Sequence, residues 1–241
     1  MIKFRSAALT DIGRVRSENE DRYLHEPEKL YFGVADGVGG LPGGAEAAQA
    51  TLEHIVAGLD AHRTESVPDL IEVVHQANEA VLQLGHTINP EMGIGSTLTF
   101  GLIKGDHLHL AHVGDSRAYL VRNGEIRALT NDHSVENEAR MRRARGEKIY
   151  FHEVNRNALT RCMGQPTPPE VDLISEALRP GDHFLFCTDG ITRLVSEKEL
   201  ASIAVNFDQP EAALRDIIAL AIRRGGPDNA TGVLVTIDAL E

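Results

Sequence analysis

Hydrophobic residues follow two different spacings along this chain, and each spacing occurs in blocks. Over 46–60 and 68–84 apolar side chains recur every three or four positions, which predicts two consecutive helices. Short apolar or alternating runs then predict a block of four strands at 97–104, 107–113, 117–122 and 125–129. The turns inside this block, Gly105-Asp106 and Asn123-Gly124, are typical of hairpins.

The same periodicities predict the remaining elements. Further strands are expected at 2–9, 30–35, 171–178, 182–187 and 231–238, with another short strand after Asp21. Further helices are expected at 134–145, 197–205 and 210–223, whereas 146–161 is ambiguous.

Strands grouped with strands, and helices grouped in pairs, favour an α+β fold over an alternating βαβ fold. We expect two mostly antiparallel sheets packed face to face with helix pairs outside, an αββα four-layer sandwich. With 241 residues and no break in composition, the whole chain, 1–241, is predicted to form one domain.

Charge and cysteine content exclude several classes of protein. The chain has 36 Asp and Glu against 24 Lys and Arg, a net charge of −12, which disfavours a nucleic-acid partner. No apolar run is long enough for a membrane helix, and the first residues do not resemble a signal peptide. Two cysteines without CxxC spacing indicate a reducing compartment, so we expect a cytoplasmic protein without membrane or nucleic-acid partners.

Acidic residues stand where the predicted strands begin or end. Asp36, Asp115 and Asp189 each follow an apolar run, Asp228 precedes the last strand, and Asp21 follows Glu20 at the start of another. An Asp-Gly pair at a strand end is often only a turn. Several buried carboxylates that meet would repel each other, and hard divalent cations such as Mg²⁺ or Mn²⁺ would offset this repulsion. Turn chemistry and a shared metal site both remain open at this point.

An ordered series of motifs also runs along the chain. It consists of Arg16-Ser-Glu-Asn-Glu-Asp21, Ala35-Asp-Gly-Val-Gly-Gly40, Gly95-Ser-Thr97, His112-Val-Gly-Asp-Ser-Arg117, Asn131-Asp-His-Ser134, Cys187-Thr-Asp-Gly190 and Gly226-Pro-Asp-Asn-Ala-Thr231. The series resembles that of the PP2C-type (PPM) metal-dependent Ser/Thr protein phosphatases, most closely the small bacterial members, over nearly the whole chain. The resemblance implies the αββα sandwich that the block pattern indicates independently.

The resemblance also implies a role for each acid. Asp36 would bridge two metal ions, and the Gly37 carbonyl would bind one of them. Asp189 and Asp228 would complete the protein ligands of the other. Asp115, together with Asp189, would hold a third ion, and Glu20 and Asp21 would act through water or as supporting residues.

The implied reaction is hydrolysis of phosphoserine and phosphothreonine by direct attack of a hydroxide that bridges two Mg²⁺ or Mn²⁺ ions. Arg16 matches the arginine that grips the substrate phosphate, although a solvated loop arginine is the alternative. Val38 stands where eukaryotic relatives have a histidine thought to protonate the leaving group. Valine cannot transfer a proton, so we assign no general acid.

The segment at about 134–157 corresponds to the family's flap, which is linked to substrate choice. It is locally basic, and the arginines of its predicted helix are Arg140, Arg142, Arg143 and Arg145. They either attract an acidic phosphopeptide or form an ordinary solvated helix face.

Two other functions compete with metal-dependent hydrolysis. Cys187 and Arg193 fit the Cys-x₅-Arg spacing of cysteine-dependent phosphatases, but Asp189 inside that loop would repel phosphate, which favours a core role for Cys187. A phosphoprotein-binding pseudophosphatase is disfavoured because every metal-ligand position is filled. The expected partner is a phosphorylated protein, a Ser/Thr kinase or its target, in a bacterial signalling pathway. We expect the protein to be a monomer.

Overall fold

A computed structural model describes residues 2–38, 42–62 and 66–240. Gly39 and Gly40 of the second motif lie outside the described residues. Two five-stranded sheets form the centre of the fold, and every strand pair in them is antiparallel. In spatial order the strands of one sheet are β1 (Ile2–Asp11), β10 (Ala230–Leu240), β9 (His183–Cys187), β6 (Arg117–Arg122) and β7 (Glu125–Ala128). Those of the other are β2 (Asp21–Glu26), β3 (Tyr31–Asp36), β4 (Leu98–Lys104), β5 (His107–Val113) and β8 (Asp172–Ala177).

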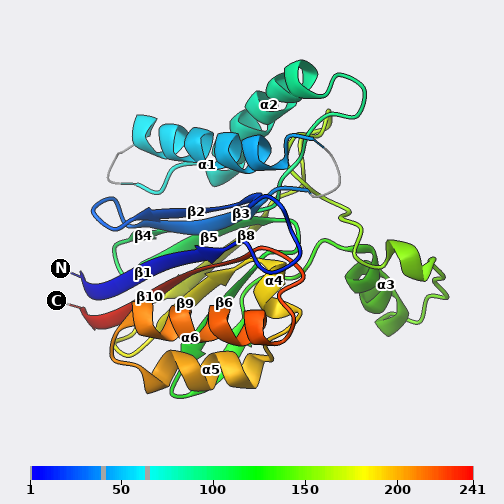
Figure 1. The fold of residues 1–241 in the computed structure, drawn as a ribbon. Coiled ribbons are helices and arrows are strands. Elements are labelled where there is room, and N and C mark those ends of the chain that lie inside the picture. Colours follow the sequence, from blue (N-terminus) through cyan, green and yellow to red (C-terminus); the bar gives the residue numbers. More distant parts are fainter. Residues whose placement is uncertain (1, 39–41, 63–65, 241) are drawn as a thin grey trace.

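Helix pairs cover the outer faces of both sheets (Figure 1). The β2-β3-β4-β5-β8 sheet is covered by α1 (Gly44–Ala61) and α2 (Leu70–Ile88), and the β1-β10-β9-β6-β7 sheet by α5 (Glu197–Asn206) and α6 (Pro210–Arg223). The expected α+β fold, an αββα four-layer sandwich, is therefore confirmed. Among the described residues, no helix has the length and apolar character that crossing a bilayer requires.

Strand β3 shows how alternation builds these layers. Phe32 and Val34 point into the apolar core between the sheets, whereas Tyr31 and Ala35 pack in the core under the helix pair. All four side chains are buried, so the strand is apolar at every position up to its last residue, Asp36. An acidic residue at this end is therefore brought to the rim of the sandwich.

The predicted elements are confirmed with small shifts at their ends. In the Asn123-Gly124 turn both residues have positive φ, 55° and 79°, as a tight hairpin turn requires. Helix α2 begins after Asp69, whose carboxylate accepts hydrogen bonds from the backbone N–H groups of Ile71 and Glu72. Two short elements were not predicted: α4 (Asp189–Thr192) and the 3₁₀ turn Glu153–Asn155.

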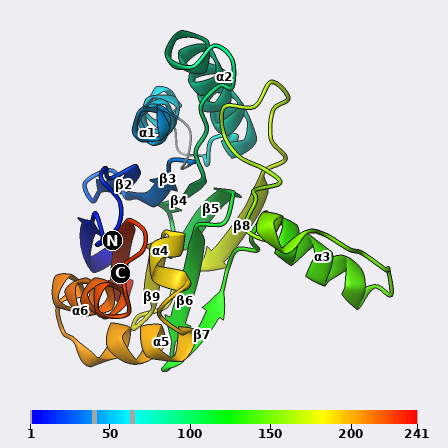
Figure 2. The same ribbon diagram turned by 45° about the vertical axis from the view of Figure 1, so that its right-hand side comes forward.

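Helix α3 (Val135–Ala144) stands apart from the four layers. It projects from the body of the molecule beside the ends of β5 and β8 (Figures 1 and 2). The segments that lead into and out of this projection are hydrogen-bonded to each other: the Val135 N–H donates to the Ala158 carbonyl, and the Thr160 N–H donates to the His133 carbonyl. This projection is the segment expected to be the flap.

Candidate active site: an acidic cleft at one end of the sandwich

One cleft of about 370 Å³ collects most of the acids expected at the site. Asp36 comes from the end of β3, Asp115 from the loop after β5, Asp189 from the start of α4, and Asp228 from the residues before β10. Glu20 also lines this cleft. The two sheets thus contribute carboxylates to a single cavity at their shared end.

Asp36 is fixed through its backbone. Its N–H donates to the Thr97 hydroxyl at 2.9 Å, and the Thr97 N–H donates to the Asp36 carbonyl at 2.8 Å. The Thr97 hydroxyl also contacts the Ser116 hydroxyl at 2.8 Å. The motif residues Thr97 and Ser116 therefore hold the position of Asp36, a role that the motif pattern alone did not reveal.

Gly37 allows a very close approach between β3 and α1. A Cβ atom at this position would lie 2.3 Å from the carbonyl oxygen of Gly44, the first residue of α1. Because this neighbour is backbone, it cannot rotate away, so only glycine fits here. The approach leaves Gly37 and Val38 lining the cleft.

Asp21 lies beneath the cleft and is almost fully buried. Thr188 donates a hydrogen bond to Asp21 Oδ2 at 2.8 Å, whereas Asp21 Oδ1 has no partner. Thr188 also accepts from the Thr231 N–H, so one hydroxyl links β2, β9 and β10. Burial raises the pKa of Asp21 to about 7 even though the hydrogen bond from Thr188 lowers it.

Asp189 and Asp115 lie next to one another and share a cationic neighbour. Arg193 forms an ion pair with Asp189 Oδ2, and its Nη2 lies 3.7 Å from Asp115 Oδ2. Asp189 Oδ1 is buried without a hydrogen-bond partner. Burial and the Asp189 charge raise the pKa of Asp115 to about 7, and burial also raises the pKa of Asp189.

Arg16 reaches the cleft from the loop between β1 and β2. Its Nη2 donates to Asp228 Oδ2 at 2.9 Å, and its Nη1 lies 3.8 Å from Glu20. Asn229 holds this loop in place: its amide donates to the carbonyls of Ile12 and Glu18, and its Oδ1 accepts from the Glu20 N–H. Asn229 is thus a positioning residue that the sequence indicated only as a motif member.

The cleft carries an excess of negative charge. Two guanidinium groups, Arg16 and Arg193, line the cleft with five carboxylates, those of Glu20, Asp36, Asp115, Asp189 and Asp228, and Asp21 is buried next to Asp36 on the neighbouring strand. Burial and the neighbouring charge of Asp21 raise the pKa of Asp36 well above its usual range. With Asp21 included, the six carboxylates exceed the two guanidinium groups by four formal negative charges, which two divalent cations would balance.

The donors fit such cations, but they do not form a finished cage. Among residues 2–38, 42–62 and 66–240, no three acidic, histidine or cysteine side chains are grouped closely enough to hold an ion by themselves. Mg²⁺ usually takes one or two carboxylates and keeps several waters, so it does not need such a cage. The unpartnered buried oxygens of Asp21 and Asp189 are the observations that favour a cation here.

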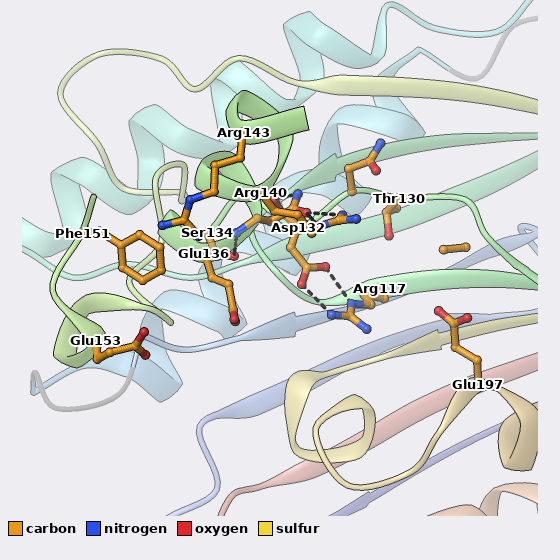
Figure 3. Close-up of a pocket in the computed structure, with 13 residues that line it drawn as sticks. Arg117, Thr130, Asp132, Ser134, Glu136, Arg140, Arg143, Phe151, Glu153 and Glu197 are labelled. Carbon is orange, nitrogen blue, oxygen red and sulfur yellow. Dashed lines mark hydrogen bonds and ion pairs between the residues drawn. The ribbon is translucent and has the colours of Figure 1, made fainter. Parts of the chain in front are cut away.

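The flap arginines do not face this cleft. Arg140 and Arg143 border a separate cavity of about 530 Å³, together with Phe151 and the Arg117–Asp132 ion pair (Figure 3). Arg143 donates to Ile149 O and lies over the Phe151 ring. The remaining pair points elsewhere: Arg142 pairs with Glu147, and Arg145 is exposed at the end of α3. Only the base of the flap, at 157–159, lines the acidic cleft.

The structure disfavours the cysteine-dependent alternative. Cys187 is completely buried in the core beneath α5 and α6, and burial raises the pKa of its thiol to about 12. A thiol with this pKa is not a nucleophilic thiolate at neutral pH. Arg193, the arginine of that spacing, is paired with Asp189 instead.

The αββα fold and the acidic cleft together define the class of metal-dependent phosphatases that the motif series resembles. The family model described as Protein phosphatase 2C matches residues 4–230. A putative protein phosphatase 2C-type of Streptococcus pyogenes serotype M6 is 32% identical over 236 residues, which are 94% of each chain. The chain belongs to the protein phosphatase 2C family, whose members are metal-dependent Ser/Thr phosphatases.

Among the similar proteins is a phosphatase whose crystal structure contains metal ions. The serine/threonine protein phosphatase PstP of Mycobacterium tuberculosis is 32% identical over 240 residues, which cover 97% of this chain but 45% of PstP. This chain therefore spans less than half the length of that relative. A crystal structure of the catalytic domain of PstP in complex with two manganese ions has a TM-score of 0.82 and 30% identity, covering 98% of this chain and 99% of that one.

Proposed function

We propose that this protein hydrolyses phosphoserine and phosphothreonine in proteins at the acidic cleft, by direct attack of water on phosphorus and without a phosphoenzyme. The observation that carries the proposal is the meeting of aspartates from both sheets in one cleft, with buried oxygens of Asp21 and Asp189 left without partners. Carboxylates in this state need cations rather than a phosphate dianion as their nearest neighbours. Filled ligand positions disfavour the pseudophosphatase alternative.

The family resemblance suggests which residues would hold the cations. Asp36 would contact two Mg²⁺ or Mn²⁺ ions, with the Gly37 carbonyl on one and Asp189 and Asp228 on the other. Asp115 and Asp189 would hold a third. Two divalent cations in such a site activate water and neutralise the phosphate charge. Glu20 and Asp21 would orient water and the neighbouring ligands.

The chain's own groups bind and position the substrate. Arg16 presents a planar fork that can donate two hydrogen bonds to a phosphate, while its pairing with Asp228 keeps the guanidinium at the mouth of the cleft. Asn229 fixes the loop that carries Arg16, and Thr97 fixes Asp36. Val38 lines the cleft and offers no proton, so no side chain is assigned as the general acid.

Hydrolysis of p-nitrophenyl phosphate and of a phosphothreonine peptide with Mn²⁺ tests the proposal. We expect activity to disappear with EDTA, and to fall by about 10³-fold or more in Asp36→Asn, because a bridging ligand is lost. Asp60→Asn is the matched control: Asp60 is a half-buried carboxylate of α1 that pairs with Lys29 and does not line the cleft, so this variant should keep full activity. Activity that survives both EDTA and Asp36→Asn would refute the proposal.

A cysteine variant separates the rival mechanism. Cys187→Ser should retain metal-dependent activity, because the thiol lies in the core and touches no substrate. A variant that loses its turnover while it remains folded by circular dichroism would favour the thiolate mechanism instead.

We infer a substrate-steering role for the flap arginines. The base of the flap lines the cleft and its exposed arginines on α3 do not, so these charges would contact residues of a protein substrate that flank the phosphate. Neutralising Arg142 and Arg143 together should lower kcat/KM for a phosphoprotein more than for p-nitrophenyl phosphate. Glu147→Gln, which removes the partner of Arg142, should have the opposite effect. Equal effects on both substrates would discard steering.

The biological setting follows from the same activity. The substrate would be a product of a Ser/Thr kinase, or the kinase itself, in the cytoplasm of a bacterium. The chain would act as a single domain and as a monomer. Light scattering coupled to size-exclusion chromatography tests the monomer, and a mass near 53 kDa, twice 26.3 kDa, would contradict it.

A further inference from the structure

Arg193 holds an unusual place among the site carboxylates. Arg193 is the residue directly after the short helix α4, one turn after Asp189. Its Nη2 atom approaches Oδ2 of both Asp189 and Asp115. A positive charge therefore lies between two buried carboxylates that repel each other. This is also where a third divalent ion held by Asp115 and Asp189 would lie.

The two oxygens of Asp189 have different surroundings. Oδ2 is occupied by Arg193, whereas Oδ1 is buried and has no partner. Oδ1 is thus available to an ion shared with Asp36 and Asp228, while the side of Asp189 that faces Asp115 already has a cation. A guanidinium and a divalent ion cannot fill the same space between Asp115 and Asp189.

We propose that Arg193 is a built-in cation that competes with the third divalent ion for the Asp115–Asp189 pair. The inference rests on the proposed function, since it takes the metal set from it. The Arg193 side chain is 42% exposed, so it can swing into solvent when an ion displaces it. Arg193 therefore weakens the binding of the third ion most, because it lies between the two ligands of that ion, and it offsets part of the negative charge of the metal-free site.

Manganese binding measured by electron paramagnetic resonance tests the competition, because only free Mn²⁺ gives the strong aqueous signal. Arg193→Met should tighten the weakest of three binding steps about tenfold or more, since a positive charge next to that ion is removed. Arg193→Lys retains the charge and should stay closer to the wild-type affinity. Arg215→Met is the matched control: Arg215 is exposed, pairs with Glu211 one turn away on α6, and does not line the acidic cleft.

A double variant locates the effect. Asp115→Asn removes one of the two carboxylates, so adding Arg193→Met to it should no longer tighten any binding step. In EDTA, Arg193→Met should melt at a lower temperature than the wild-type protein, and saturating Mn²⁺ should raise its melting temperature by more than it raises that of the wild type.

The wild-type protein alone supplies a further test should Arg193→Met not fold. The Nε–Hε NMR resonance of Arg193 should shift only at the Mg²⁺ concentrations that fill the weakest site. The inference is overturned if that resonance is insensitive to the third step, or if Arg193→Met leaves the weakest affinity within about twofold of wild type. Absence of any manganese binding by the wild-type protein would instead refute the proposed function.

Discussion

Asp21 should make the metal-free protein lose stability as the pH rises. Its pKa is raised from 3.8 to about 7 by burial, so between these values the folded protein keeps a proton that the unfolded chain has released. The unfolded state then binds fewer protons, and the free energy of unfolding falls with pH, by about 4 kcal/mol over this window at about 1.4 kcal/mol per pKa unit. Above pH 7 this contribution becomes constant.

Asp21→Asn removes the titration and nearly preserves the shape of the side chain. The new amide leaves buried donors next to the unpartnered oxygen position, at a cost of about 1–2 kcal/mol. We therefore expect the variant to be less stable than wild type at pH 4 by this amount. At pH 8 in EDTA it should be more stable, by about 2–3 kcal/mol. Removing one charge also lowers the pKa of Asp36, so the gains of several such variants will not add.

Urea unfolding in EDTA at pH 4, 6 and 8 measures this reversal. Asp238→Asn is the control for the same substitution: Arg5 lowers the pKa of Asp238, so its stabilisation is lost only below pH 4 and the variant should run parallel to wild type from pH 4 to 8. The reasoning is refuted if Asp21→Asn also runs parallel to wild type. Saturating Mn²⁺ should abolish most of the pH dependence, because bound cations hold the carboxylates in their charged form.

Three further substitutions test other parts of the structure. Arg16→Met should raise KM for p-nitrophenyl phosphate by about tenfold or more, and Arg16→Lys should raise it less. An unchanged KM in steady-state kinetics would show that Arg16 does not bind the phosphate. Asn78→Ala should lower the free energy of unfolding by about 2–4 kcal/mol, because it strips the acceptor from two N–H groups, those of Gly164 and Gln165; a loss below about 0.5 kcal/mol in urea would contradict this. In Gly190→Ala the new Cβ would lie 1.8 Å from the carbonyl oxygen of Asn229, so the free energy of unfolding should fall by at least about 2 kcal/mol. Calorimetry should also show weaker Mn²⁺ binding by this variant. Wild-type affinity would show that Asp189 and Asp228 are not displaced.

The sequence predicted the sandwich because its elements are amphipathic over several turns or alternations. The helix at 210–223 was predicted with the boundaries that the structure shows, since its apolar face is continuous and Pro210 marks its start. Helix α4 was missed because four residues are too few to display a helical period. Its first residue, Asp189, was nevertheless identified from its place after an apolar strand.

The candidate site was predictable as a set of acids but not as a set of contacts. Motif spacing identified the aspartates, whereas the hydroxyl of Thr188 on Asp21 and the amide of Asn229 on the Arg16 loop depend on segments about 170 to 210 residues apart. Arg193 appeared only as part of a misleading cysteine motif. Counting charges in the flap gave its sign but not the direction in which Arg140 and Arg143 point.

The order of strands has a consequence for how the chain must fold. Strand β10 lies between β1 and β9, and it pairs with β1 from Ile2–Leu240 to Asp11–Ala230. On a ribosome adding about 5–20 residues per second, β10 is synthesised on the order of 10 to 50 s after β1, the strand with which it pairs. Pairing between strands so far apart in the sequence also makes refolding slow, because the chain loses the entropy of closing this long loop before the strand contacts form. A chain that stops short of β10 would leave β1 and β9 with open edges, the geometry from which intermolecular sheets and aggregates grow.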